Sequence, residues 1–473
     1  AAARAAGVPP GTPPKAAKRS RPTEDTEMGG EEVNKRSQAA EERLAEADAG
    51  ADVQCRECNA DEFGLNFPLP WEEKRGQGCS TACIVKLYDG DEEVVKLCDT
   101  VEIVGVLCVN PEIANLSDVL SPSDNVLGTD ARQPSTALVP RLHAIMVRKL
   151  PFQHPSLNFT PAWLTEERLA AAFQRSFAAG ALAAARSAAQ EHLAQNLGGD
   201  KLASEYALML LASRAFDRRG GMALGAWSLN LAGVPGNADL RGLCQGLAEL
   251  APRVAHLELS EDLLASRRWQ PRKDFSANRL LAGQLQLAQG TLLLLDERPL
   301  TASDQQLAEA PLKSLEAVRS VVSRQSLPCD YSSYDVDIPL EVQCIAVSQQ
   351  RSRVAQGMAD VTLPLRPTSE LGAGSLPVDL KATRMLLGLV TRSPRPLKIP
   401  DDVADRFSRD FASVRAEMPM LPAELCHSWM ALARAYCLTH GEEELTMDRW
   451  LTVLGLERER LQRCRQQNLL VQE

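Results

Sequence analysis

One aliphatic run that ends in two carboxylates constrains the fold of this chain more than any other feature. Residues 292–295 are consecutive leucines, and Asp296 and Glu297 follow them directly. An unbroken apolar run of this length is typical of a buried strand. Such a strand can hold a Mg²⁺ ion with one carboxylate and orient a water molecule with the other, as phosphoryl transfer requires. The alternative is a buried strand that simply enters an acidic loop.

An upstream segment, residues 227–240, has the outline of a phosphate-binding loop. Its sequence, WSLNLAGVPGNADL, predicts a strand, then a turn that contains Gly233, Pro235 and Gly236, and then a helix. A phosphate-binding loop needs a lysine beside the β- and γ-phosphates and a Ser or Thr hydroxyl on the metal ion. Asp239 and Leu240 occupy those two positions. The sequence therefore predicts a degenerate nucleotide site, in which the outline is kept and the binding groups are lost.

The exchange of lysine for a carboxylate has a large electrostatic effect. At about 4 Å from a phosphate, it replaces an attraction by a repulsion of about 4 kcal/mol per unit charge at an effective dielectric of about 20. The leucine also removes a ligand of the metal ion. Free N–H groups at the start of the next helix can still attract an anion weakly. We therefore expect no nucleotide cofactor, no catalytic residue and no enzyme activity.

Both segments resemble the AAA+ domains of the minichromosome maintenance (MCM) replicative helicases. Those domains carry a G-D-P-G-x-x-K-S loop, of which Gly233, Pro235 and Gly236 are present here. They also carry an Ala-Gly block that closes in Asp-Glu. This second block is matched at Ala282, Gly283, Leu285, Leu287, Ala288, Gly290, Asp296 and Glu297. The resemblance implies an AAA+-like module without its catalytic groups.

Three further segments resemble a more specific family, the MCM-binding proteins. They are LNFPLP at residues 65–70, ALVPRLHAI at 137–145 and KDFSANRLLAG at 273–283. The similarity extends from about residue 15 to the last residue. It implies a non-catalytic adaptor or chaperone in the nucleus that binds MCM helicase subunits and regulates the assembly, storage or unloading of the MCM complex in DNA replication.

Composition divides the chain into four regions. Residues 1–52 contain hardly any large apolar side chain, which predicts a disordered tail. Residues 53–150 contain short aliphatic runs separated by turn signals, which predicts a small OB-like β domain. Residues 155–376 alternate between strand and helix patterns, as expected of a degenerate AAA+-like α/β domain. Residues 377–473 predict a C-terminal helical domain that resembles the lid of MCM ATPases.

The tail contains two basic clusters with the spacing of a bipartite nuclear-import signal. The first cluster contains Lys18, Arg19 and Arg21, and the second contains Lys35 and Arg36. Short basic clusters are often only solvated charges. Because the chain resembles a nuclear family, we expect these residues to direct import.

Four cysteines have a spacing that would suit a tetrahedral zinc site. Cys55 and Cys58 form a C-x-x-C pair, and Cys79 and Cys83 follow about twenty residues later. The alternative is that these thiols pack as small apolar groups. The sequence has no secretory apolar segment, which favours a reducing compartment over disulfide formation.

Charge and composition weigh against two other functions. An active ATPase subunit of an MCM-like ring would use Asp296 and Glu297, but Asp239 opposes nucleotide binding. A single-stranded DNA-binding OB protein would need a basic groove with aromatic platforms, but the net charge is −10 and aromatic residues make up 4% of the chain. No apolar stretch approaches the ~20 residues of a membrane span. We expect MCM helicase subunits as partners, with no membrane and no direct sequence-specific binding of nucleic acid.

Two further positions can be compared with the MCM helicases. A strand at residues 342–348 would place a polar side chain beside the γ-phosphate, and Ser348, Gln349 and Gln350 lie at its end. Arg434 lies in a stretch that resembles the helicase lid. Because the loop lacks its lysine, we expect Arg434 to have a surface or interface role instead of sensing a nucleotide.

Overall fold

The structure is a computed structural model. It describes residues 83–88, 90, 95–108, 140–149, 180–275, 279–300, 307–355, 360–372, 380–391 and 397–469. The acidic and basic tail, with Lys18, Arg19, Arg21, Lys35 and Arg36, lies outside these residues, as do Cys55, Cys58 and Cys79.

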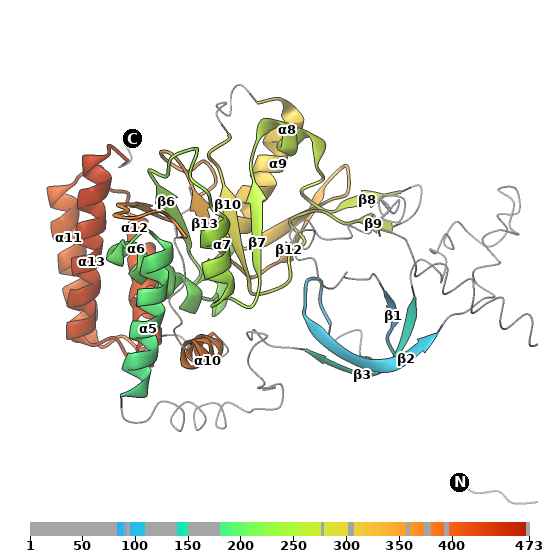
Figure 1. Cartoon of the computed structure of the whole chain (residues 1–473), viewed down its shortest axis with the longest axis horizontal. Coiled ribbons are helices and arrows are strands. Elements are labelled where there is room, and N and C mark those ends of the chain that lie inside the picture. The colour runs from blue at the N-terminus through green and yellow to red at the C-terminus, as the bar shows by residue number, and fades with distance from the viewer. Residues whose placement is uncertain are drawn as a thin grey trace, which may run out of the picture. The chain divides into compact units, whose positions relative to one another are not determined.

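A five-stranded parallel sheet forms the centre of the α/β region, with the strand order β14-β6-β13-β10-β7 (Figure 1). Its strands are β6 (Ser228–Ala232), β7 (Val254–Glu258), β10 (Thr291–Asp296), β13 (Val342–Val347) and β14 (Asp360–Pro364). The helical segments between them are α7 (Arg241–Ala248), α8 (Glu261–Ser266), α9 (Glu309–Arg319) and the π-helical turn η2 (Ser320–Arg324). Strands that alternate with helices produce parallel pairing because each connection must return to the starting edge of the sheet.

Alternate leucines of β10 enter two different hydrophobic cores. Leu292 and Leu294 pack in one core, Leu293 and Leu295 pack in the other, and all four are fully buried. Successive side chains of a strand point to opposite faces, so a strand covered on both sides needs an apolar residue at every position. The unbroken leucine run is thus explained by the central place of β10 in the sheet, and the predicted burial of this strand is confirmed.

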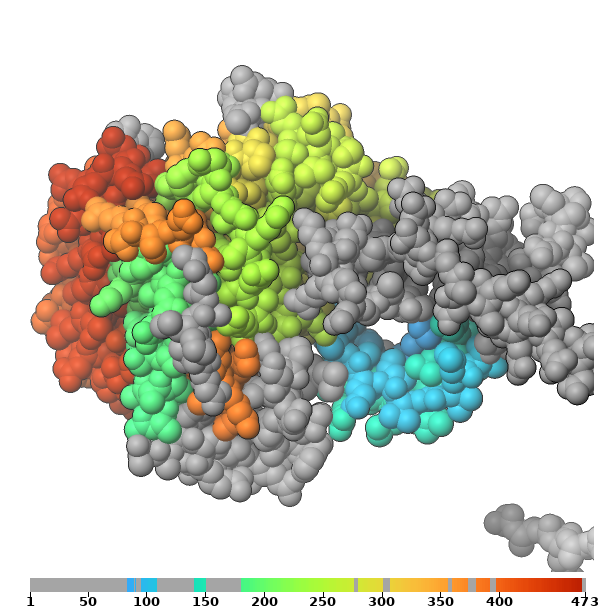
Figure 2. Space-filling view, in the orientation of Figure 1, coloured from blue at the N-terminus to red at the C-terminus, as the bar shows by residue number. Residues whose placement is uncertain are grey.

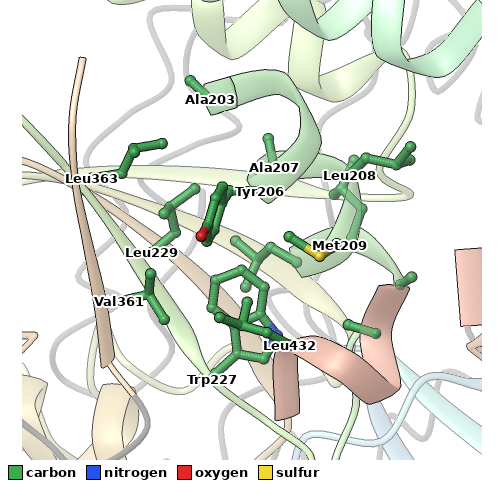
Figure 3. Close-up of a cluster of buried hydrophobic side chains, with 14 of the residues drawn as sticks. Ala203, Tyr206, Ala207, Leu208, Met209, Trp227, Leu229, Val361, Leu363 and Leu432 are labelled. Carbon is green, nitrogen blue, oxygen red and sulfur yellow. The ribbon is translucent and has the colours of Figure 1, made fainter. Parts of the chain in front are cut away.

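Helices cover the face of the sheet that carries Leu292 and Leu294. They are α5 (Ala181–Asn196), α6 (Lys201–Ala212), α10 (Lys381–Val390), α11 (Asp401–Glu417), α12 (Leu425–Thr439) and α13 (Met447–Gln466). Figure 3 shows Tyr206 of α6 and Leu432 of α12 among side chains of the sheet, including Leu229 and Val361. The C-terminal helices therefore share one core with the sheet, and in the space-filling view they adjoin the green atoms of α5 (Figure 2).

Helix α6 is buried around its whole circumference. Every residue from Leu202 to Ala212 is buried, as expected of a helix that is packed between layers. Asp200 caps its first turn by accepting hydrogen bonds from the backbone N–H groups of Leu202 and Ala203. The same carboxylate also accepts a 2.6 Å charged hydrogen bond from Arg463 of α13. One side chain thus fixes both the start of α6 and its contact with the last helix.

Three smaller sheets complete the described elements. One contains β1 (Ile84–Lys86), β3 (Arg141–Lys149) and β2 (Val101–Cys108), in that order. A second has the order β12-β11-β8-β9, and a third is the hairpin of β4 and β5. Their bounds are β4 (Asp217–Arg219), β5 (Met222–Leu224), β8 (Arg272–Asp274), β9 (Arg279–Leu281), β11 (Ser326–Asp330) and β12 (Asp335–Pro339). The described helices include none with the length and apolar character needed to cross a membrane.

Candidate functional site

The predicted loop and the two carboxylates lie at the same edge of the five-stranded sheet. Strands β6 and β10 both pair with β13 in the parallel direction, so the ends of β6 and β10 lie at one edge, where open α/β sheets bind their ligands. Val234 donates its backbone N–H to the carbonyl of Ser348 over 3.1 Å, and Ser348 donates to the carbonyl of Leu231 over 3.0 Å. These bonds tie the turn after β6 to the end of β13. Gly233 has a φ of 82°, which only glycine adopts without strain.

Arg298 fills the space between the turn and the carboxylates. Its Nε donates to Oδ1 of Asp296 and its Nη2 donates to Oδ2, each over 2.8 Å. Its Nη1 donates to the carbonyl oxygens of Pro235, over 2.7 Å, and Ala238, over 2.8 Å. The side chains of Arg298 and Asp296 are each only 8% exposed. One guanidinium therefore contacts both halves of the site at once.

This arrangement reverses the polarity of a phosphate-binding loop. Such a loop directs backbone N–H groups at an anion, whereas the turn here directs two carbonyl oxygens at a cation. Both oxygens of Asp296 are engaged by Arg298, which places a positive charge where a metal ion would bind. The hydrogen bond to Asp296 raises the pKa of Arg298 above its ordinary value. The positive charge that a nucleotide site takes from lysine and Mg²⁺ is supplied here by the chain itself.

Asp239 and Leu240 both have structural roles. Oδ1 of Asp239 accepts a 2.9 Å hydrogen bond from the backbone N–H of Arg241, in the first turn of α7. Asp239 also lies close enough to Arg298 to favour its charged form. Leu240 is 3% exposed and packs in the core beneath α7. The position at which a nucleotide site has a hydroxyl is therefore part of the hydrophobic core.

Glu297 is held by the loop that follows β13. It is 6% exposed, and its carboxylate accepts a 2.5 Å hydrogen bond from the hydroxyl of Ser352 and a 2.7 Å bond from the backbone N–H of Arg353. Burial raises the pKa of Glu297, and these hydrogen bonds partly oppose that rise. Because each oxygen has a donor from the loop, Glu297 holds this loop against the end of β10.

The polar residues at the end of β13 also hold the turn. The Ser348 hydroxyl lies 2.9 Å from Oδ1 of Asn230, and Nε2 of Gln349 contacts the carbonyl of Arg298 at 3.4 Å. A Cβ atom on Gly236 would lie 3.0 Å from the Gln349 amide, so this glycine permits a close approach. Ser348 and Gln349, at the position compared with a γ-phosphate contact, therefore stabilise the turn after β6.

Sequence reasoning did not find Arg298. The available signal was a basic residue two positions after a strand-terminal Asp, which allows a bidentate ion pair within a short loop. The contacts with Pro235 and Ala238 carry no local signal, since those residues lie about sixty positions earlier in the chain.

Arg434 lies elsewhere in the fold. It is 4% exposed, its guanidinium lies 4.8 Å from the centroid of the Phe216 ring, and it donates a 3.3 Å hydrogen bond to the carbonyl of Arg214. Of the surface or interface role expected for Arg434, the surface role is wrong, because the side chain is buried and lines a separate pocket; the interface role stays a prediction.

We did not expect a bound metal, and the four cysteines that offered zinc as an alternative lie largely outside the described residues. Cys83 is the one member of the predicted set that the structure describes, and it is exposed with a free thiol. Within the described ranges, no three His, Cys, Asp or Glu side chains are placed to hold a metal ion together.

The fold and this site define an α/β protein in which Arg298 fills the edge of the parallel sheet where open α/β sheets bind ligands. The chain belongs to the family described as mini-chromosome maintenance replisome factor, whose model matches residues 4–464. A mini-chromosome maintenance complex-binding protein from Salmo salar is 32% identical over 427 residues, which cover 86% of this chain and 65% of the relative. The protein of the same name from Homo sapiens is 29% identical over 451 residues, covering 90% and 67%.

A plant protein extends this similarity. The mini-chromosome maintenance complex-binding protein of Arabidopsis thaliana is 28% identical over 390 residues, which cover 82% of this chain and 64% of the relative. The chain thus spans about two thirds of the length of these relatives.

Proposed function

We propose that this chain is a non-catalytic nuclear adaptor that binds MCM helicase subunits and regulates the assembly, storage or unloading of the MCM complex in DNA replication. Membership of the family, and the names of the relatives as complex-binding proteins, support the partner. Nuclear localisation rests on the basic clusters of the tail and on the resemblance. An ATPase subunit and a single-stranded DNA-binding protein remain the alternatives to be tested.

We propose further that the α/β region is a degenerate AAA+-like module with the C-terminal helices as its lid. Two observations support this. Strands β6 and β10 flank β13, so the turn and the Asp-Glu pair meet at one edge of a parallel sheet. Polar residues at the end of β13 face that same turn. An OB-like fold for residues 53–150 is likewise a proposal, supported by the antiparallel pair of β2 and β3.

A subunit-shaped protein without a working site offers a simple mechanism for regulating a ring. Head-to-tail rings are built from one repeated heterologous interface. A protein with the shape of a subunit can occupy one side of that interface, while its other side does not complete a ring. Binding of this kind depends on packed side chains and needs no nucleotide from the adaptor.

The proposal that the protein is not an ATPase is supported by the contacts of Arg298 with Asp296 and with the turn after β6. A nucleotide phosphate would have to displace a buried bidentate ion pair and would then face two carbonyl oxygens. Because water can reach this pair through the exposed turn, breaking it should cost about 1–3 kcal/mol, which opposes displacement.

Co-precipitation with purified MCM subunits tests the proposal. We expect equal retention of the subunits with ATP, with ADP and without nucleotide, and retention in moderate salt, where exposed ion pairs are screened beyond about 8 Å. In parallel, ATP turnover should stay at background. Loss of MCM retention under all conditions would refute the partner, whereas steady hydrolysis that Glu297→Gln abolishes would refute the non-catalytic role alone.

A further inference from the structure

A pocket of about 560 Å³ lies away from the closed turn. It is bordered by the β4–β5 hairpin, by η2, by the segment before α11 and by α12. Its apolar lining includes Phe216, Met222, Leu224, Leu397, Ile399 and Met430. This volume falls in the range of about 300–1,000 Å³ that is usual for ligand sites.

The polar lining of this pocket is basic. Arg324, His427 and Arg434 contribute to it, and the described lining residues include no aspartate or glutamate. The chain as a whole carries a net charge of −10, so the basic lining of this pocket contrasts with the negative charge of the protein. The carboxylate of Asp360 accepts hydrogen bonds from the hydroxyls of Ser228 and of the lining residue Ser323.

The basic side chains occupy two depths. Arg434 is 4% exposed and stacks on Phe216, while Arg324 and His427 are exposed at the rim. Burial lowers the pKa of Arg434 to about 10, although the group remains charged at neutral pH. An anion that enters the pocket therefore meets a cation in a poorly solvated position, where charge interactions are stronger than in water.

Apolar side chains are also exposed beside these cations. Met222 is 39% exposed and Ile399 is 38% exposed. A pocket that combines an apolar interior with an exposed apolar rim suits an anchor side chain of a bound protein, since a few such anchors supply most of the affinity in protein complexes. Charges at the rim then select the partner and its orientation.

We propose that this pocket binds an acidic amphipathic peptide segment of a partner protein. One large apolar side chain of the segment enters between Met222, Ile399 and Met430. Neighbouring carboxylates of the segment face Arg324 and His427. The site lies apart from the closed turn and does not require that the segment belong to an MCM subunit.

Fluorescence anisotropy of a labelled synthetic peptide tests this site in the full chain. The probe carries a central Leu-Phe pair with two glutamates on each side. One control peptide has lysines in place of the glutamates, and a second has Ala-Ala in place of Leu-Phe. We expect saturable binding of the acidic probe and at least tenfold weaker binding of both control peptides, because each lacks one of the two recognised features.

Charge reversal at the rim provides the matched protein variants. Arg324→Glu combined with His427→Glu should weaken binding of the acidic probe about tenfold, since one attraction becomes a repulsion and a second negative charge is added at an exposed rim. Arg458→Glu, which changes an exposed arginine on α13, should leave it unchanged. Thermal unfolding of each variant checks that the fold is retained.

Three outcomes would overturn the proposal. They are equal binding of the acidic and the lysine probes, unchanged affinity in the double variant, and competition by an oligothymidylate as effective as that by unlabelled peptide. The last outcome would identify a general anion or nucleic-acid surface. Because MCM retention is measured separately, failure of this site and failure of the proposed function can be distinguished.

Discussion

Two buried arginine–carboxylate clusters use the same chemistry in different surroundings. At the edge of the sheet, Arg298 joins Asp296 to an exposed turn. Inside the helical layer, Arg460 donates to both oxygens of Glu457 over 2.9 and 2.7 Å and to the carbonyl of Thr362 over 3.0 Å. Tyr206 donates to the same Glu457 over 2.5 Å.

The difference lies in what surrounds each ion pair. Glu457 is fully buried and accepts from Arg460 of α13 and Tyr206 of α6, while Arg460 also donates to Thr362 of β14, so the cluster joins three elements in the interior. Arg298 instead lies next to Pro235, Gly236 and Asp239, which are exposed. The interior cluster is therefore expected to stabilise the whole fold, whereas the edge cluster mainly closes a local site.

The largest loss of stability is expected from a substitution in the interior cluster. Glu457→Leu should lower the free energy of unfolding by about 3–5 kcal/mol, because it leaves Arg460 charged and buried without its carboxylate. Burial opposes the charge of Arg460, and in the wild type Glu457 outweighs burial and raises the pKa of this arginine; the variant keeps the burial and loses that support. Urea unfolding followed by circular dichroism measures the change.

The double variant Glu457→Leu with Arg460→Met is the control. Replacing both partners by apolar residues removes the unpaired charge and should recover much of the lost stability. A single variant that loses less than about 1 kcal/mol would show that the interior cluster is no more important than an exposed ion pair.

A smaller effect is expected at the edge of the sheet. Arg298→Ala should lower stability by about 1–3 kcal/mol, because water can reach Asp296 through the exposed turn and partly replace the lost hydrogen bonds. Differential scanning calorimetry would detect this as a fall of a few degrees, at about 2–4 °C per kcal/mol. A loss as large as that of Glu457→Leu would remove the distinction between the two clusters.

These two clusters also indicate how far the sequence predicts the structure. The leucine run of β10 required burial on both faces, because any polar residue there would enter a core. The outline of the turn followed from Gly233, Pro235 and Gly236. The role of Arg298 was not predictable, because its contacts with Pro235 and Ala238 arise only when β6 and β10 are brought to the same edge of the sheet. The pocket was also not predictable, since its lining comes from four separate segments.

His440, which lies in the helical layer, should make the stability of the protein depend on pH. Burial lowers the pKa of His440 from 6.5 to about 4, while its Nδ1 donates a 2.9 Å hydrogen bond to the carbonyl of Tyr436. The unfolded chain therefore binds a proton more readily than the folded chain between those values. Stability should be fully present above about pH 6.5 and should fall as the pH drops toward 4.

The expected change from His440 is about 1–2 kcal/mol, a discounted figure because the ring is partly exposed and solvent screens its charge. Urea unfolding at pH 7 and pH 5 measures it against His440→Gln, which has no titrating ring. If the variant shows the same pH dependence between these two values as the wild type, His440 is not the group responsible.

The smallest effect is expected on nucleotide binding, when Arg298 no longer fills the space beside the turn. Removing Arg298 and adding a lysine, with Arg298→Ala and Asp239→Lys, restores the charge pattern of a phosphate-binding loop while Leu240 stays in its core position. Binding of fluorescent ATP with Mg²⁺ should still be no tighter than about 1 mM, equivalent to about −4 kcal/mol, because the carbonyls of Pro235 and Ala238 still face the site. Asp239→Lys alone is the matched control, since Arg298 then still fills the space. Micromolar binding by the double variant would mean that two side chains alone had closed the site and that the backbone of the turn can still receive a phosphate.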